Sequence, residues 1–253
     1  MIKFFRKIRQ RMLSAGKFRK YIIYAIGEII LVVFGILIAL QINNWNENEK
    51  AEDKEIKLLI ELKDDLIETK NDLITDIEKV QRILETTNNQ YKAIIKNQIS
   101  DRSPYKISQG DIFSSALLYP KLSAYEAIQS EGITIISNDN LRNEITDFYQ
   151  LQLKRVVNTE SILEELNLKV LKPYLNTFSS YGSTCKDCED LYELYNTGPN
   201  TNIYLIHSAD DKLVHILKEK FLLLKALNSR YTGVSRRIDE IVALIDQETN
   251  SKL

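Results

Sequence analysis

The two cysteines of the chain, Cys185 and Cys188, are separated by two residues and are the first candidates for chemistry. In an oxidising compartment, a pair this close in sequence forms a local disulfide. Redox catalysis would require a βαβ context, which the surrounding sequence lacks. A zinc site would require two further ligands, and only His207 lies nearby. The pattern therefore favours a disulfide over a metal site or reactive thiols.

His207 and His215 are the only histidines, and their spacing matches no metal-binding motif. We expect His215 to lie on a helix surface. The sequence contains no G-x-S-x-G, H-E-x-x-H, P-loop or Rossmann glycine pattern. Acidic residues alternate with lysines along the expected helices, which is typical of solvated helix faces. We therefore expect a protein that is not an enzyme and that holds no metal or cofactor.

Glu28 is the only charged residue in the apolar stretch YIIYAIGEIILVVFGILIALQI, residues 21–42. At 100° per residue, Glu28, Gly35 and Ala39 fall within about 20° of one line along a helix. Gly35 and Ala39 form a small-xxx-small pair that lets a second helix approach closely, and a charge facing lipid is costly. The stripe predicts a helix–helix contact within a membrane. The alternative is that Glu28 is protonated or snorkels toward the basic tail and that Gly35 is incidental.

The stretch that carries Glu28 is long enough to cross a membrane. As a helix it spans roughly 33 Å, against about 30 Å for a hydrocarbon core, and Trp45 follows as an interfacial ring. Residues 1–20 contain eight basic residues and no acid, whereas acids outnumber bases in residues 46–55. The positive-inside rule places the N-terminus in the cytoplasm and the rest of the chain on the other side. A cleaved signal peptide would have a shorter apolar run and an A-x-A-like site.

Two segments resemble a known family. MIKFFRKIRQ, followed by YAIGEIILVVFGILIALQINNWNE, resembles the N-terminal signature of a family of uncharacterised single-pass membrane proteins of Bacteroidota, a domain of unknown function. The segment YEAIQSEGITIISNDNLRNEITDFYQ, residues 125–150, is similar to the middle segment of that family. The resemblance implies an inner-membrane anchor with a periplasmic domain, and it implies no activity.

The apolar spacing predicts an all-α fold in which an N-terminal transmembrane helix is followed by an elongated, mostly antiparallel helical bundle. We expect a basic amphipathic cytoplasmic tail over residues 1–20, the transmembrane helix over 21–42 and a periplasmic domain over 43–253. Three–four spacing marks long helices over about 51–98, 138–171 and 210–247, and the first can continue almost directly from the span. A single exposed coiled-coil stalk is the alternative for the first of them.

The residues between these helices carry breaking signals. Within 99–137 we expect short helices near 111–118 and 123–130, a helix end at Gly132, and a fold over the bundle as a cap, with a strand over 133–136 as an alternative. Ser137 or Asn138 should cap the second long helix, whose apolar line includes Val170 and which Pro173 kinks or ends. Residues 178–208 are expected to form a polar loop that ends in a sequence resembling a capping box, residues 208–211.

Charge and layout limit the function. The formal net charge is −1, and no later part of the chain matches the density of basic residues in the first twenty, which gives no support for nucleic-acid binding. The leading hypothesis is a membrane-anchored periplasmic scaffold or sensor that acts through protein contacts, either as a homo-oligomer or with a membrane-protein partner. One alternative is an accessory subunit of a proton-driven or transport complex that uses Glu28. The other is a periplasmic small-ligand sensor, with tyrosines around residues 119–125 and 174–204 lining its pocket.

Overall fold

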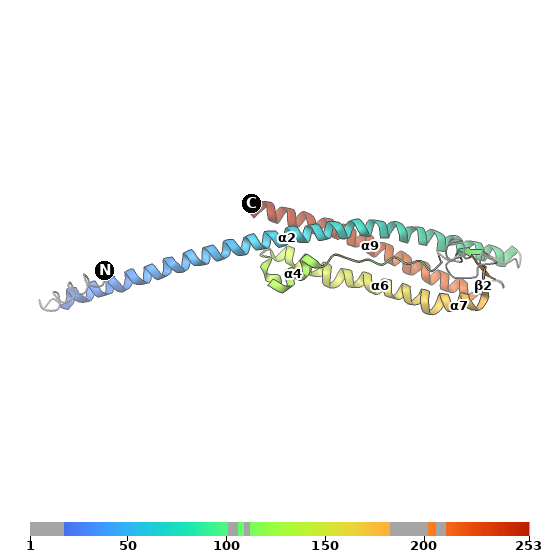
Figure 1. Ribbon diagram of the computed structural model, residues 1–253, viewed down its shortest axis with the longest axis horizontal. Helices are drawn as coiled ribbons and strands as arrows, with labels where there is room; N and C mark the ends of the chain where they lie inside the picture. The colour runs from blue at the N-terminus through green and yellow to red at the C-terminus, as the bar shows by residue number, and fades with distance from the viewer. Residues whose placement is uncertain (1–17, 101–105, 109–111, 183–201, 206–210, 253) are drawn as a thin grey trace, which may run out of the picture. The chain divides into compact units, whose positions relative to one another are not determined.

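The computed structural model describes residues 18–100, 106–108, 112–182, 202–205 and 211–252 (Figure 1). The chain divides into two compact units, residues 1–56 and residues 57–253. Helices dominate the described part of the chain, which confirms the predicted all-α class. The expected amphipathic tail lies almost entirely outside the described residues.

α2 runs from Phe18 to Ser100 as one helix of 83 residues. It contains both the predicted membrane span, in the first unit, and the first long helix of the second unit. Between Gly35 and the end of α2 there is no glycine or proline to interrupt the backbone hydrogen bonds. The prediction that the two segments are continuous is therefore confirmed.

The second long helix consists of five segments that follow one another without a gap. They are α5 (Asp139–Asp147), η2 (Phe148–Gln152), α6 (Leu153–Glu165), η3 (Leu166–Leu171) and α7 (Lys172–Phe178). η2 and η3 are π-helical, and such a turn contains one more residue than an α-helical turn.

The two π-helical segments shift the buried line of this helix. Each of them buries two adjacent residues, Phe148 with Tyr149 and Leu166 with Asn167, and the next buried residue, Leu153 or Leu171, comes five positions after the first of the pair. Val170, which we expected on the apolar line, is 39% exposed because η3 places Leu171 there instead. The helix also continues past Pro173 to Phe178, beyond its predicted end, since the widened turn directly before Pro173 relieves the clash of its ring with the preceding turn.

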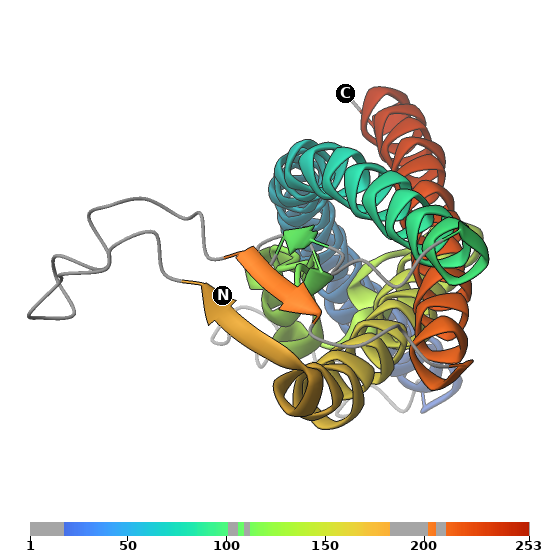
Figure 2. The ribbon, with the colours of Figure 1, turned by 90° about the vertical axis from the view of Figure 1, so that its right-hand side faces the viewer.

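The third long helix, α9, runs from Asp211 to Lys252 and is antiparallel to the other two. Lys63 of α2 pairs with Asp246 (2.6 Å) and Lys70 pairs with Asp239 (2.5 Å). A later residue of α2 thus contacts an earlier residue of α9, so the two helices run in opposite directions. Arg237 of α9 pairs with Glu144 of α5 and Tyr231 bonds Glu160 of α6, so α9 also runs antiparallel to the second helix. Figure 2 looks along the bundle, in which α2, α6 and α9 all contribute residues to one apolar core. The antiparallel bundle is confirmed for the second unit.

The predicted helix boundaries after residue 122 are confirmed at two residues. α4 (Ser123–Glu131) ends at Gly132, whose φ of 95° is in the region that favours glycine. The side-chain oxygen of Asn138 accepts hydrogen bonds from the backbone N–H groups of Asn140 (3.0 Å) and Leu141 (3.1 Å) at the start of α5. The segment where a strand was the alternative is a 3-10 turn, η1 (Ile133–Ile135).

Asn138 supports a prediction about the cap. Its Nδ2 also donates to Glu248 Oε2 (2.6 Å), and this bond, together with Lys252, lowers the pKa of Glu248. Asn138→Ala should reduce the free energy of unfolding by about 1–2 kcal/mol, measured by urea denaturation, because it removes the cap. Asn138→Ser keeps the cap oxygen but is too short to reach Glu248, so it should reduce the free energy of unfolding by less than Asn138→Ala does. Equal losses in the two variants would show that the cap contributes little.

Two connecting regions differ from the prediction. Residues 113–122 contain no helix, although we expected one near 111–118. The expected polar loop contains two strands, β2 (Ser179–Gly182) and β3 (Asn202–Leu205), and β3 pairs with β2 and with β1 (Lys106–Ser108) in an antiparallel sheet of order β1-β3-β2. The predicted capping box begins outside the described residues, and α9 is described from Asp211.

Candidate functional site

The membrane-contact stripe lies on α2. Of the described helices, α2 alone is long and apolar enough to cross a membrane. Glu28, Gly35 and Ala39 occupy one face of it because the helix is continuous through this range. Gly35 and Ala39 are exposed, Glu28 is partly exposed, and a Cβ at Gly35 would meet no atom within 4 Å. The described residues of the first unit thus leave this face accessible.

The predicted cysteine pair, Cys185 and Cys188, lies outside the described residues, as does His207. His215 is exposed on α9, as predicted. The described part of the chain contains no group of three or more His, Cys, Asp or Glu side chains placed to hold a metal ion.

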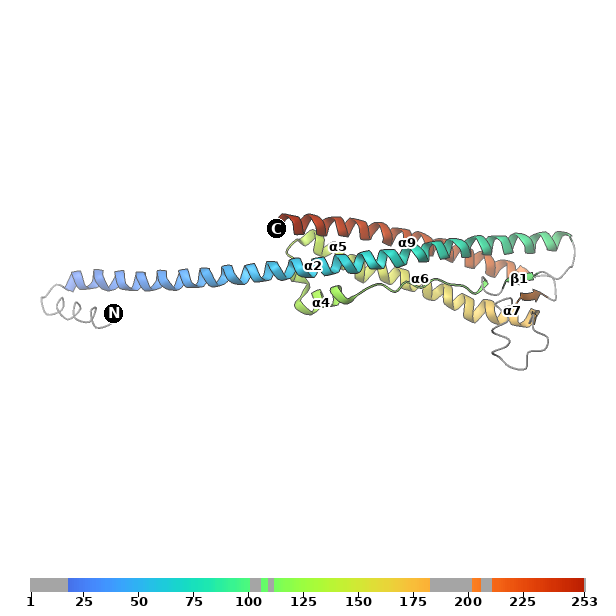
Figure 3. The same ribbon diagram turned by 45° about the horizontal axis from the view of Figure 1, so that its top comes forward.

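An extended segment, residues 112–122, takes the place of a fourth helix in the bundle, and we call it the strap. Figure 3 shows the strap running lengthwise between α4 and the region of β1. Ile112, Ala116 and Leu118 are buried at even-numbered positions, the alternation of an extended chain with one face packed on a core. An extended chain cannot satisfy its own backbone polar groups, so these groups need partners from the helices.

Glu160 of α6 provides the central partner of the strap. Its Oε1 accepts a hydrogen bond from the backbone N–H of Leu118 (3.0 Å) and another from the hydroxyl of Tyr231 on α9 (2.5 Å). All three groups are buried. Burial raises the pKa of Glu160, although both hydrogen bonds oppose that rise. Burial and the bond to Glu160 raise the pKa of Tyr231.

Asp65 and Thr69 of α2 hold the end of the strap that leads into α4. Thr69 Oγ1 accepts from the backbone N–H of Lys121 (2.9 Å) and donates to the carbonyl of Asp65 (2.8 Å). Asp65 Oδ2 accepts from the Ser123 hydroxyl (2.7 Å) and from the Ala124 N–H (2.8 Å), which gives α4 an N-terminal acceptor from another helix. Thr69 falls between Leu66 and Leu73 at three–four spacing, and this contact explains a hydroxyl at that place.

Lys220 of α9 holds the opposite end of the strap. It is fully buried, and its Nζ donates to the backbone carbonyl of Ile112. Burial lowers the pKa of Lys220 to about 8, because the charged ammonium loses hydration.

Lys220 belongs to a set of buried polar side chains that we call the polar layer: Thr87, Gln90, Asn167 and Lys220. On α9 it lies between Leu217 and Leu224, which belong to separate apolar clusters. The ion pair between Lys70 and Asp239 sets the register of α2 against α9. Gln90 lies twenty residues after Lys70 and Lys220 lies nineteen residues before Asp239, so the antiparallel register brings Gln90 opposite Lys220. Among the described residues, Gln90 Oε1 and both amide atoms of Asn167 find no hydrogen-bond partner. The layer therefore interrupts the core at a cost in stability.

Of the tyrosines expected to line a pocket, Tyr119, Tyr125 and Tyr174 lie in separate places, and Tyr192 and Tyr195 lie outside the described residues. Tyr125 is buried and stacks on Tyr149, with ring centroids 4.0 Å apart and an angle of 7° between the planes. Tyr119 is 76% exposed. Tyr174 lies beneath the ammonium of Lys212 (5.3 Å from nitrogen to ring centroid). None of these three lines the cleft described next.

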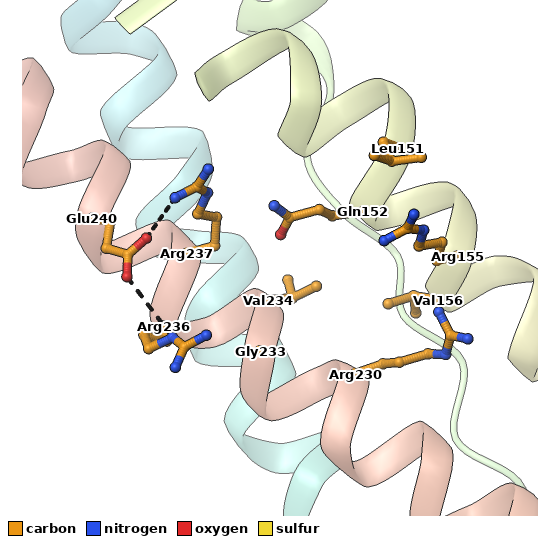
Figure 4. A pocket seen from close by; sticks show the side chains of 10 residues that line it. All are labelled: Leu151, Gln152, Arg155, Val156, Arg230, Gly233, Val234, Arg236, Arg237 and Glu240. Carbon is orange, nitrogen blue, oxygen red and sulfur yellow. Dashed lines mark hydrogen bonds and ion pairs between the residues drawn. The ribbon is translucent and has the colours of Figure 1, made fainter. Parts of the chain in front are cut away.

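An arginine-lined cleft opens between the second helix and α9 (Figure 4). Its volume is about 330 Å³. Gln152, Arg155 and Val156 line one side, with Leu151 beside them. α9 supplies the remaining lining residues: Arg230, Gly233, Val234, Arg236, Arg237 and Glu240. We call this site the arginine cleft.

Sequence reasoning missed Glu160, Lys220 and the arginine cleft. Glu160 falls between Val156 and Leu163 at a seam position of three–four spacing, and Lys220 falls between Leu217 and Leu224 in the same way. For both residues, a charged side chain at a seam position was the signal in the sequence that could have indicated a buried polar contact. The arginines carried no such signal, because they come from two helices and read as solvated faces.

Comparison with known proteins agrees with the resemblance to an uncharacterised family. No curated protein and no solved structure matches the chain. A model described as a family of unknown function, DUF6090, matches residues 28–181. That range contains Glu28, the strap and Glu160, whereas α9 with Lys220 lies outside it. Because the match covers more than half of the sequence, the chain belongs to the DUF6090 family of unknown function.

Proposed function

We propose that the protein is a membrane-anchored scaffold or sensor that acts through protein contacts in the periplasm and does not catalyse a reaction. The observation that carries this proposal is the continuity of α2, which contains the apolar span and one of the three packed helices of the bundle. A change in how α2 packs in the bundle can therefore reach the membrane within a single helix. The basic residues of the first twenty support a cytoplasmic N-terminus.

The contact within the membrane is assigned to the Glu28, Gly35 and Ala39 stripe, through a second copy or another membrane protein. The exposed backbone at Gly35 supports this assignment, since close approach between membrane helices depends on small residues. Gly35→Leu should lower the association constant about tenfold, because the leucine separates the two backbones. Cysteine crosslinking along the helix in native membranes measures this, with maximal yield expected at positions 28, 32, 35, 39 and 42.

Leu37→Ala is the matched control, because Leu37 lies on the opposite face of the helix from Gly35. It should leave the crosslinking pattern unchanged. Gly35→Leu makes the span more apolar, so membrane insertion should persist and can be checked by fractionation. A crosslinking yield that is equal around the whole helix and unchanged by Gly35→Leu would contradict the proposal. The span would then only anchor the domain in the membrane.

A further inference from the structure

The arginine cleft carries more positive charge than its carboxylates neutralise. Glu240 contacts Arg236 (3.8 Å) and Arg237 (2.7 Å), and Arg237 also pairs with Glu144 on α5. Arg155 and Arg230 form no ion pair with any carboxylate in the described part of the chain. Two guanidinium groups from different helices therefore share one cleft, and neither has an acidic partner among the described residues.

The side chains of the cleft converge from both walls. Figure 4 shows the guanidinium groups of Arg155 and Arg230 on either side of Val156, and the Gln152 amide extending from the helix of Arg155 toward α9. Val156 and Val234 are buried and form an apolar base. Gly233 leaves part of the α9 wall bare, since a Cβ there would meet no atom within 4 Å.

We propose that the arginine cleft binds a ligand through a phosphate-type oxyanion held between Arg155 and Arg230. The planar guanidinium fork matches the geometry of such oxyanions and binds them through two parallel hydrogen bonds. An oxyanion between the two arginines also relieves the repulsion between their charges. Gln152 adds an amide donor to the lining of the same cleft.

The size of the cleft limits the ligand. A volume of about 330 Å³ is at the lower end of the range for small-molecule sites. It suits a phosphorylated small solute or the phosphate of a lipid headgroup, which present the same chemistry. The site involves no residue of the membrane span, so its test and the crosslinking test can fail independently.

The first experiment measures binding of inorganic phosphate and pyrophosphate to the full chain in uncharged detergent, by calorimetry at constant ionic strength. The wild type should bind pyrophosphate saturably, with a Kd of about 1 mM or tighter. The double variant Arg155→Gln, Arg230→Gln should weaken binding at least about tenfold, because two charged donors are lost. Lys225→Gln, which removes an exposed charge of α9 outside the cleft, should change the Kd less than about twofold.

Two further variants separate the cleft from general charge attraction. Gly233→Leu should weaken binding as much as the double variant does, because it fills the cleft without changing any charge. Glu240→Gln should strengthen binding, because it frees Arg236 and Arg237 from their carboxylate. Circular dichroism should show the same helix content in all variants. An equal loss of binding in Lys225→Gln and in the double variant would overturn the proposal.

A lipid arm identifies the source of the oxyanion. The full chain is melted in micelles that contain phosphatidylglycerol or, at the same mole fraction, phosphatidylcholine. A rise in Tm with phosphatidylglycerol alone, absent in the double variant, assigns the site to a lipid headgroup. Binding of pyrophosphate without that rise assigns it to a free solute. Neither effect in the wild type, or both effects retained in the double variant, would disprove the site.

Discussion

Glu160→Ala should lower the free energy of unfolding of the bundle by about 2–5 kcal/mol, the largest effect we expect from a single polar substitution. The alanine leaves two buried donors unpaired, the Leu118 N–H and the Tyr231 hydroxyl. Each unsatisfied buried donor costs about 1–3 kcal/mol. Urea denaturation of the full chain, followed by circular dichroism, measures the loss.

Glu160→Gln is the matched control, because its amide oxygen can accept both hydrogen bonds without carrying a charge. It should retain most of the stability at neutral pH. Since the folded pKa of Glu160 is raised above its unfolded value, the wild type gains stability from its proton only at low pH and loses that contribution as pH rises through the folded pKa. The free energy of unfolding of the glutamine variant should therefore rise relative to that of the wild type as pH increases. A loss in Glu160→Gln as large as in Glu160→Ala would show that the ionised carboxylate itself is required.

Lys220 should make stability rise with pH in an alkaline range. Its folded pKa is about 8 and its ordinary value is 10.5, so between these values the unfolded chain holds a proton that the folded chain has released. Stability increases with pH wherever the unfolded state binds more protons. The wild type should gain up to about 3 kcal/mol across this range relative to Lys220→Met. Urea denaturation at several pH values checks the difference between the two slopes.

Lys220→Met keeps the length of the side chain and removes its charge. The variant also leaves the Ile112 carbonyl without this donor, but that loss does not depend on pH and cannot produce a slope. Tyr149 and Tyr231, whose pKa values burial raises, lower stability at still higher pH in both proteins and cancel in the comparison. Parallel curves for the wild type and Lys220→Met would contradict the lowered pKa.

The long helices were predictable because their signals are local. Unbroken three–four spacing located α2 and α9, a left-handed glycine located the end of α4, and Asn138 located the start of α5. The π-helical segments were not predictable in this way. Periodicity assumes a constant number of residues per turn, and η2 and η3 each add one residue where tertiary packing tolerates it.

The strap was missed for a different reason. Its backbone is satisfied by Glu160, Thr69 and Lys220, which lie far from it in sequence, so nothing in residues 112–122 alone distinguishes it from a short helix. The same holds for the arginine cleft, whose lining residues come from two helices and lie more than seventy positions apart in the sequence. Sequence patterns indicated the buried faces of single helices, whereas the strap contacts and the arginine cleft depend on how separate elements pack against one another.

The strap also imposes an order on assembly during synthesis. Because a chain emerges N-terminus first, α2, the strap and α6 are available before α9. The contacts of Lys121 with Thr69 and of Leu118 with Glu160 need nothing beyond residue 160, so one end of the strap can be fixed early. The Ile112 end waits for Lys220, and Glu160 waits for Tyr231. α9, which emerges after these helices, thus completes the burial of groups that they have already brought together.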